Sequence, residues 1–208
     1  MTVFIHVEEP SMEDALKALL PRLMRDRGDE VRIIDHGSKQ RLLRDLKHRL
    51  AGYRAQLSRE DGIRVLVVID RDDDDCTRLK ARLEEIAANA GLSTKSTPDA
   101  AGRFHVVNRI VIEELEAWFF GDISALCAAY PGVPPSLARK RGFRQPDAIT
   151  GGTWERLLKE LQKAGYYESL ERLPKREVAR RVAAVMDPAR NCSPSFRHFV
   201  AGLDALLA

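Results

Sequence analysis

The sequence is poor in cysteine and has no long apolar run. Its three cysteines, Cys76, Cys127 and Cys192, lie far apart and form no CxxC pair. Disulfide bonds and a thiolate zinc site are therefore not expected, and each cysteine is predicted to be a small buried or half-buried hydrophobic residue. No apolar stretch approaches the roughly 18–20 residues that a membrane span needs, so no membrane association is expected.

Signals for export and nucleotide-binding motifs are missing as well. The first residues have no positively charged start and no small-residue cleavage site. Together with the sparse cysteines, this predicts a cytoplasmic location. There is no P-loop, no GxGxxG and no nucleophile elbow, so any ATP that is used must be bound by another chain.

The chain also lacks a large excess of charge of either sign. Its 208 residues include 34 basic and 31 acidic side chains, which leaves a net charge of +3. This excludes nucleic-acid binding by bulk charge alone. The charges are nevertheless segregated, because five of the six residues from Asp70 to Asp75 are acidic. Residues 39–64 carry eight basic residues against three acids, and residues 139–197 carry fourteen against seven.

Four strand-like segments alternate with helical patterns in the first part of the chain. β-Branched and apolar runs predict strands at 2–7, 30–36, 63–69 and 103–112. Apolar repeats at helical spacing predict helices between them, the first one kinked or broken by a proline, and a further helix that carries Glu113, Glu114 and Glu116. Such alternation is typical of an α/β fold with a mainly parallel sheet flanked by helices.

No strand-like run follows Gly121. Helices are expected there at about 153–164, 174–186 and 194–207. We therefore predict an α/β domain over residues 1–122 and a helical C-terminal extension over residues 123–208 that packs on it.

Acidic residues follow three of the predicted strands, where ligands of parallel α/β sheets collect. Glu8 follows the first strand and Asp70 and Asp72 the third, while three glutamates, Glu113, Glu114 and Glu116, follow the fourth. Unpaired carboxylates repel by about 1 kcal/mol per pair at 4 Å in water. A divalent cation relieves this, and oxygen-only ligands favour Mg²⁺ or Mn²⁺. The alternatives are solvated loop acids, a helix cap at Asp75 and a helix-dipole acid at Glu113.

Basic side chains could bind phosphate beside such a pocket. The candidates are Lys39, Arg41, Arg44, Arg139, Lys140, Arg141 and Arg144. The alternative is that they form ordinary solvated helix faces. The aromatic run at 118–120 could stack on nucleobases, but burial is the stronger expectation. His6 and His105 are expected to be core histidines.

The acidic segments resemble the Toprim domain of topoisomerases, primases and related nucleases. That domain has a glutamate after its first strand, here in VEEPSME, and an Asp-x-Asp after a later strand, here in VIDRD. The whole chain resembles, more closely, a bacterial family of Toprim-like proteins of the DUF4276 type. The segments that carry this resemblance are VEEPSMEDAL, HGSKQRLL, VLVVIDRDDDD, IEELEAWFFGD, GGTWERL and MDPARN.

The resemblance implies a Toprim-like fold and a role for each matching residue. Glu8 would act as general acid or base or hold a metal, Asp70 and Asp72 would hold Mg²⁺, and Glu116 with Glu114 or Glu113 would complete the site. It also implies a separately encoded ATPase partner in an anti-phage or toxin-like system.

The leading hypothesis is thus a Mg²⁺-dependent phosphodiesterase or nuclease that acts on DNA or RNA. One alternative is a non-catalytic module that binds nucleic acid or a partner ATPase and retains a metal site. The other is a hydrolase of small phosphate compounds that uses the same carboxylates.

Overall fold

The computed structural model describes residues 1–24, 27–57 and 62–208. It divides into two compact units. The first unit comprises residues 1–10, 26–110 and 198–208, and the second comprises 11–25 and 111–197.

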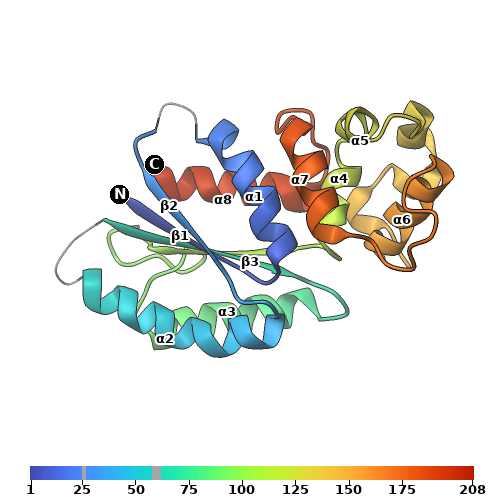
Figure 1. Ribbon diagram of the computed structural model, residues 1–208. Coiled ribbons are helices and arrows are strands. Elements are labelled where there is room, and N and C mark those ends of the chain that lie inside the picture. The colour runs from blue at the N-terminus through green and yellow to red at the C-terminus, as the bar shows by residue number, and fades with distance from the viewer. Residues whose placement is uncertain (25–26, 58–61) are drawn as a thin grey trace. The chain divides into compact units, whose positions relative to one another are not determined.

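The first unit is built on a four-stranded, all-parallel sheet. Its strands are β1 (Thr2–Val7), β2 (Glu30–Asp35), β3 (Ile63–Asp70) and β4 (Val106–Val111). They lie in the order β2-β1-β3-β4 (Figure 1). β1 pairs with both of its neighbours, so that Val7 lies opposite Asp35 on one side and Val68 on the other. This confirms the expected α/β class with a parallel sheet flanked by helices.

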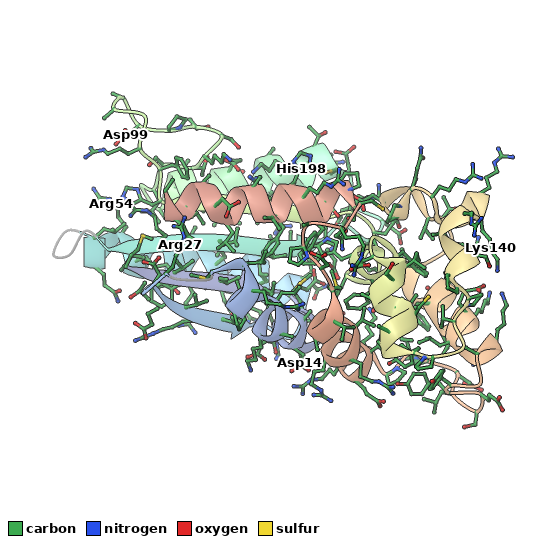
Figure 2. The ribbon with its side chains drawn as sticks, turned by 90° about the horizontal axis from the view of Figure 1, so that it is seen from above. Asp14, Arg27, Arg54, Asp99, Lys140 and His198 are labelled. Atoms are coloured by element: carbon green, nitrogen blue, oxygen red, sulfur yellow. The ribbon has the colours of Figure 1, made fainter. Side chains whose placement is uncertain are left out.

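Two helices, α2 (Lys39–Leu57) and α3 (Cys76–Asn89), lie side by side on one face of the sheet (Figure 1). Alternate residues of β3 point towards them, and Val65, Val67 and Ile69 are fully buried there. Burial of apolar surface at about 25 cal/mol per Å² makes this layer the main stabilising contact of the unit. Residues 198–208 complete the unit, and the carbonyl of His198 accepts a hydrogen bond from Arg109 Nε at 2.7 Å (Figure 2).

The second unit is helical. Its helices are α1 (Pro10–Leu23), α4 (Glu116–Phe120), α5 (Ile123–Ala129), α6 (Thr153–Lys163), α7 (Lys175–Val185) and the start of α8 (Pro194–Leu207), with 3₁₀ turns η1 (Pro135–Arg139), η2 (Arg141–Phe143) and η3 (Pro146–Ala148). Asp14 of α1 (Figure 2) accepts a hydrogen bond from Arg176 Nε of α7 at 2.7 Å. Trp118 is fully buried and donates its indole N–H to Ser195 Oγ. The burial expected for the aromatic run is confirmed.

The division into units differs from the expected boundary at residue 122. The helix α1 belongs with the helical unit, because Asp14 and Arg22 bond to α7. Residues 198–208 belong with the sheet unit. Sequence order alone does not reveal such exchanges, because they depend on which elements bond to each other.

Three local expectations were wrong. The helix α1 runs two residues past Pro21, so the break that was one of the two expectations for this proline does not occur. Glu113 has a positive φ of 61° and precedes α4, so it does not share a helical face with Glu116. Cys76 and Cys192 are exposed rather than buried, because each lies at or just before the start of a helix.

Within the described ranges, no helix combines the length and the apolar character that crossing a membrane requires.

Candidate functional site

The chain changes direction within the sheet at the carboxyl ends of β1 and β3. β1 is the second strand in the order, and the strands that follow it lie on opposite sides of it. Such a topological switch point leaves a crevice where ligands of open α/β sheets bind. Glu8 directly follows β1, and Asp70 is the last residue of β3. Two acidic residues therefore occupy the place where the fold favours a ligand.

Both acids are buried, and the carboxyl group of Glu8 contacts the backbone of Asp70. Glu8 is 8% exposed and Asp70 7% exposed. Glu8 Oε2 accepts a hydrogen bond from the backbone N–H of Asp70 at 3.3 Å. Buried carboxyl groups are rare in proteins and costly unless they are partnered. Their position at the switch point is therefore the most informative feature of the site.

The side chains of Glu8 and Asp70 point to opposite faces of the sheet, because side-chain direction alternates along each strand. Phe4 and His6 of β1 pack on Tyr53 of α2, with ring centroids 4.4 and 5.7 Å apart. Glu8 continues this face of β1, whereas Asp70 follows Ile69, which packs towards α2 and α3. Because successive strand residues point to opposite faces, Asp70 is directed away from the face of Glu8.

The acidic loop after β3 turns sharply. Asp72 adopts a positive φ of 49°, which aspartate tolerates better than most residues. The amide of Asp74 donates to the carbonyl of Arg71 at 3.0 Å. The strand thus ends at Asp70, and Asp72 lies in the turn that follows it. Asp75 accepts from the amide of Arg78 at 2.8 Å, which confirms the alternative that it caps α3.

Lys39, the first residue of α2, stands at the centre of the acidic cluster. Its ammonium group lies 2.7 Å from Asp72 Oδ2 and 2.9 Å from Asp74 Oδ2, and it donates to the carbonyl of Arg71 at 3.0 Å. Its side chain is only 16% exposed. Lys39 therefore supplies a positive charge beside both Asp72 and Asp74.

Glu8 carries a strongly perturbed carboxyl group. Burial raises the pKa of Glu8 to about 7, although the nearby charge of Lys39 opposes the shift and that of Asp72 adds to it. Lys39 itself has a raised pKa, because its hydrogen bonds to Asp72 and Asp74 outweigh the opposing effect of burial. A carboxyl group that titrates near neutrality can exchange a proton with a substrate.

The donor set at this edge suits Mg²⁺ in kind. Its ligand atoms are carboxylate oxygens, which hard divalent cations prefer. Within the described part of the chain, however, no group of three or more His, Cys, Asp or Glu side chains is gathered as a cation site. Mg²⁺ is often held by one or two carboxylates together with water and substrate phosphate. Glu8 and Asp72, which both lie near Lys39, fit that description rather than a preformed cage. Metal binding by Asp70, whose side chain is directed away from the face of Glu8, stays a prediction.

The remaining predicted metal ligands belong to the second unit. Glu114 accepts hydrogen bonds from Thr153 Oγ1 at 3.0 Å and from the Trp154 amide at 3.3 Å, at the start of α6. It also pairs with Lys175 Nζ at 3.2 Å. These bonds give Glu114 a structural role within its unit. Glu116 is the first residue of α4 and is 1% exposed. Metal binding by either residue stays a prediction.

The predicted basic residues fall on both units. Lys39, Arg41 and Arg44 occupy the first turns of α2, where Arg44 pairs with Asp45 at 2.8 Å. The cluster in the second unit is exposed on η1, η2 and the residues beside them, and it consists of Arg139, Lys140, Arg141 and Arg144 (Lys140 is labelled in Figure 2).

The structure adds two basic residues that the sequence reasoning missed. Arg78 and Arg82 are exposed one turn apart on α3 and face α2 across a hollow of about 580 Å³, whose lining includes Lys39 and Asp74. Their i, i+4 spacing was visible in the sequence. Only the packing of α3 against α2 places them beside Lys39.

His6 is a core histidine, as expected. Its Nδ1 lies 2.9 Å from His36 Nε2, and its Nε2 lies 3.1 Å from the Tyr53 hydroxyl. Burial lowers the pKa of His6 to about 3, so this ring is neutral at physiological pH. His105, by contrast, is half-buried and precedes β4, where it lies 3.3 Å from Ser93 Oγ.

Comparison with known proteins agrees with the resemblance of the whole chain. No significant match was found among curated proteins or solved structures. A family model described as a domain of unknown function, DUF4276, matches residues 7–204. The match includes Glu8, Lys39 and the whole acidic loop. The chain therefore belongs to the DUF4276 family.

Proposed function

We propose that this protein is a metal-dependent phosphodiesterase that cleaves nucleic acid, with Glu8, Asp70 and Asp72 as the acidic residues of its site. The observation that carries the proposal is the buried carboxyl group of Glu8, bonded to the backbone amide of the buried Asp70 at the β1/β3 switch point. The expected Toprim-like site and its Mg²⁺ or Mn²⁺ ion remain part of this proposal.

The chemistry of phosphodiester cleavage matches these groups. A bound divalent cation supplies charge neutralisation on the phosphate and an activated nucleophile. Glu8, with its pKa of about 7, exists in both protonation states near neutral pH and can hold or release a proton. Lys39, whose ammonium group lies beside Asp72, would donate a hydrogen bond to a phosphate oxygen of the substrate.

The test is cleavage of labelled single-stranded DNA, double-stranded DNA and RNA in Mg²⁺, in Mn²⁺ and in EDTA. Glu8→Gln keeps the size of the side chain but removes its titration and charge. Asp72→Asn lies on an exposed turn and retains the positive φ, because asparagine also tolerates it. We expect each substitution to lower the cleavage rate by at least about 100-fold, since metal binding supplies several kcal/mol of transition-state stabilisation.

Asp73→Asn is the matched control. It removes one charge from the same exposed loop without touching Glu8, Lys39 or Asp72. We expect its rate to stay within about twofold of the wild type, because exposed loop acids away from the site contribute little. Cleavage that persists in EDTA or in both site variants would contradict the proposal. A Mn²⁺-induced rise in melting temperature without cleavage would favour the non-catalytic module instead.

A second candidate function is hydrolysis of a small phosphate ester. The hollow beside Lys39, at about 580 Å³, lies in the size range of small-ligand pockets. Bis(p-nitrophenyl) phosphate and p-nitrophenyl phosphate separate the two candidates, because the first is a diester and the second a monoester. Preference for the monoester, together with no nucleic-acid cleavage, would favour the small-molecule activity. A separate ATPase partner stays a prediction from the resemblance.

A further inference from the structure

We propose that the groove between α2 and α3 is the track along which one strand of the nucleic acid approaches the acidic edge. This inference rests on the proposed function, because it assigns the binding surface for the substrate of that same site. It concerns residues to which neither the family match nor the acidic motif assigns a role.

The groove consists of two adjoining hollows. The first, of about 580 Å³, is bounded by Lys39 and Asp74 at the acidic edge and by Arg78 and Arg82 on α3. The second, of about 490 Å³, continues along the helices between Lys47 and Glu85. Gln40, Leu43 and Arg82 line both hollows, so they form one continuous depression. A groove made of two adjoining hollows has room for more than a single compact ligand.

Exposed cations border the groove from both sides. Arg44 and Lys47 come from α2, and Arg78 and Arg82 come from α3. In the part of the chain that the structure describes, the side chains of Lys47, Arg78 and Arg82 form no ion pair. Arg78 and Arg82 lie one helical turn apart, or about 6 Å along the helix axis. Their guanidinium groups are thus free to bind successive anionic groups.

The acids at the end of the groove nearest the acidic edge already form ion pairs or hydrogen bonds within the protein. Asp74 pairs with Lys39, and Asp75 caps the first turn of α3. Among the described residues that line the second hollow, Glu85 is the one acid, beside Arg44, Lys47 and Arg82. The positive ends of both helix dipoles also point to the acidic edge. Charge complementarity therefore selects a polyanion, and a phosphodiester strand supplies one that ends at the phosphate-cleaving site.

The experiment measures binding in EDTA, so that it does not depend on metal or cleavage. The probe is fluorescein-labelled oligothymidylate, titrated at several salt concentrations with the full chain. We expect the double variant Arg78→Ala/Arg82→Ala to bind at least about tenfold more weakly. We also expect its plot of log affinity against log salt to be shallower by about 1.4, because each phosphate contact on a single strand contributes about 0.7.

Lys95→Ala/Arg103→Ala is the control, since it removes two exposed cations from the segment between α3 and β4 outside the groove. It should bind as the wild type does. The proposal is overturned if the wild type does not bind the oligonucleotide, if both double variants weaken binding equally, or if polyglutamate displaces the probe as effectively as unlabelled oligonucleotide. Binding that needs Arg78 and Arg82 while Glu8→Gln still cleaves would contradict the proposed site and leave the groove in place.

Discussion

At the residue scale, one lysine balances the acidic edge of the sheet. Lys39 contacts Asp72 and Asp74 directly and lowers the cost of charge on Glu8. A run of acids therefore does not by itself require a metal ion, because a lysine from a neighbouring helix can neutralise part of it. The sequence placed Lys39 near the pocket as a phosphate contact, but its pairing with the loop acids depends on the packing of α2.

A buried aspartate in the second unit, Asp122, owes its low pKa to its hydrogen-bond partners. Asp122 is buried, and its carboxylate receives two hydrogen bonds from Arg190, at 2.8 and 2.9 Å. The amides of Asp187 and Ala125 also donate to it. Burial alone would raise the pKa of Asp122, but the bonds from Arg190 and the two amides lower it below its usual value.

We expect Asp122→Asn to lower the free energy of unfolding by about 2 kcal/mol at pH 7, since charge-assisted hydrogen bonds contribute about 1.5–3 kcal/mol. Because the pKa of Asp122 is lower in the folded than in the unfolded state, its ionised carboxylate stabilises the fold at pH values above the unfolded pKa of about 3.9. This stabilisation is lost as the pH falls through the folded-state pKa. The difference between variant and wild type should therefore shrink below about pH 4. Urea unfolding at several pH values measures it.

Asp204→Asn serves as the control for that series, because Asp204 is exposed on α8. It should change stability by less than about 0.5 kcal/mol at every pH. A constant difference for Asp122→Asn from pH 7 to pH 3 would show that the charge on Asp122 does not provide the stabilisation.

At the element scale, the strands and helices around the sheet were largely predictable. β1 begins and ends where its β-branched run does, and β2 and β3 differ from the prediction by a single residue. These segments are either apolar strands or amphipathic helices with clear periods, so local pattern and tertiary environment agree. Glu113 was misplaced because a positive φ in a non-glycine residue has no local signal.

Two glycines on the α2/α3 layer have opposite roles. Gly52 lies inside α2, and a Cβ there would meet no atom within 4 Å. We expect Gly52→Ala to raise the free energy of unfolding by about 0.5–1 kcal/mol, because alanine loses less backbone entropy in a helix. Gly91 follows α3 with a φ of +71°, so Gly91→Ala should instead lower it by about 1 kcal/mol.

Chemical denaturation of the two glycine variants beside the wild type checks both signs. A stabilising effect of both substitutions would mean that the backbone after α3 does not hold the left-handed conformation. A destabilising effect of both would mean that Gly52 is required by packing that its open surroundings do not indicate.

At the scale of the whole molecule, the three cysteines form no disulfide and differ in their exposure to solvent. Cys76 and Cys192 are exposed, whereas Cys127 is half-buried and burial raises the pKa of its thiol. We expect two thiols to react rapidly with a thiol reagent in the native protein and the third only slowly or after unfolding, because the thiolate is the reactive form. Timed labelling followed by mass spectrometry of peptides identifies them.

The substitutions Cys76→Ser and Cys192→Ser should each remove one rapidly reacting thiol, and a reducing agent should leave the melting temperature unchanged. Rapid labelling of Cys127 ahead of the other two would contradict the burial order. A melting temperature that falls on reduction would reveal a disulfide that the structure does not contain.

The sequence by itself determined the class of the fold, because the periods of its apolar residues alternate between strand and helix along the first part of the chain. It also determined that Glu8 and Asp70 lie at strand ends, since those residues directly follow apolar runs. Only the tertiary structure decided that β1 and β3 are neighbours, which brings Glu8 against Asp70. It also decided that Lys39 forms an ion pair with Asp72 and that Arg78 and Arg82 border a groove. These contacts join residues far apart along the chain, so they depend on strand order and helix packing, which local patterns do not specify.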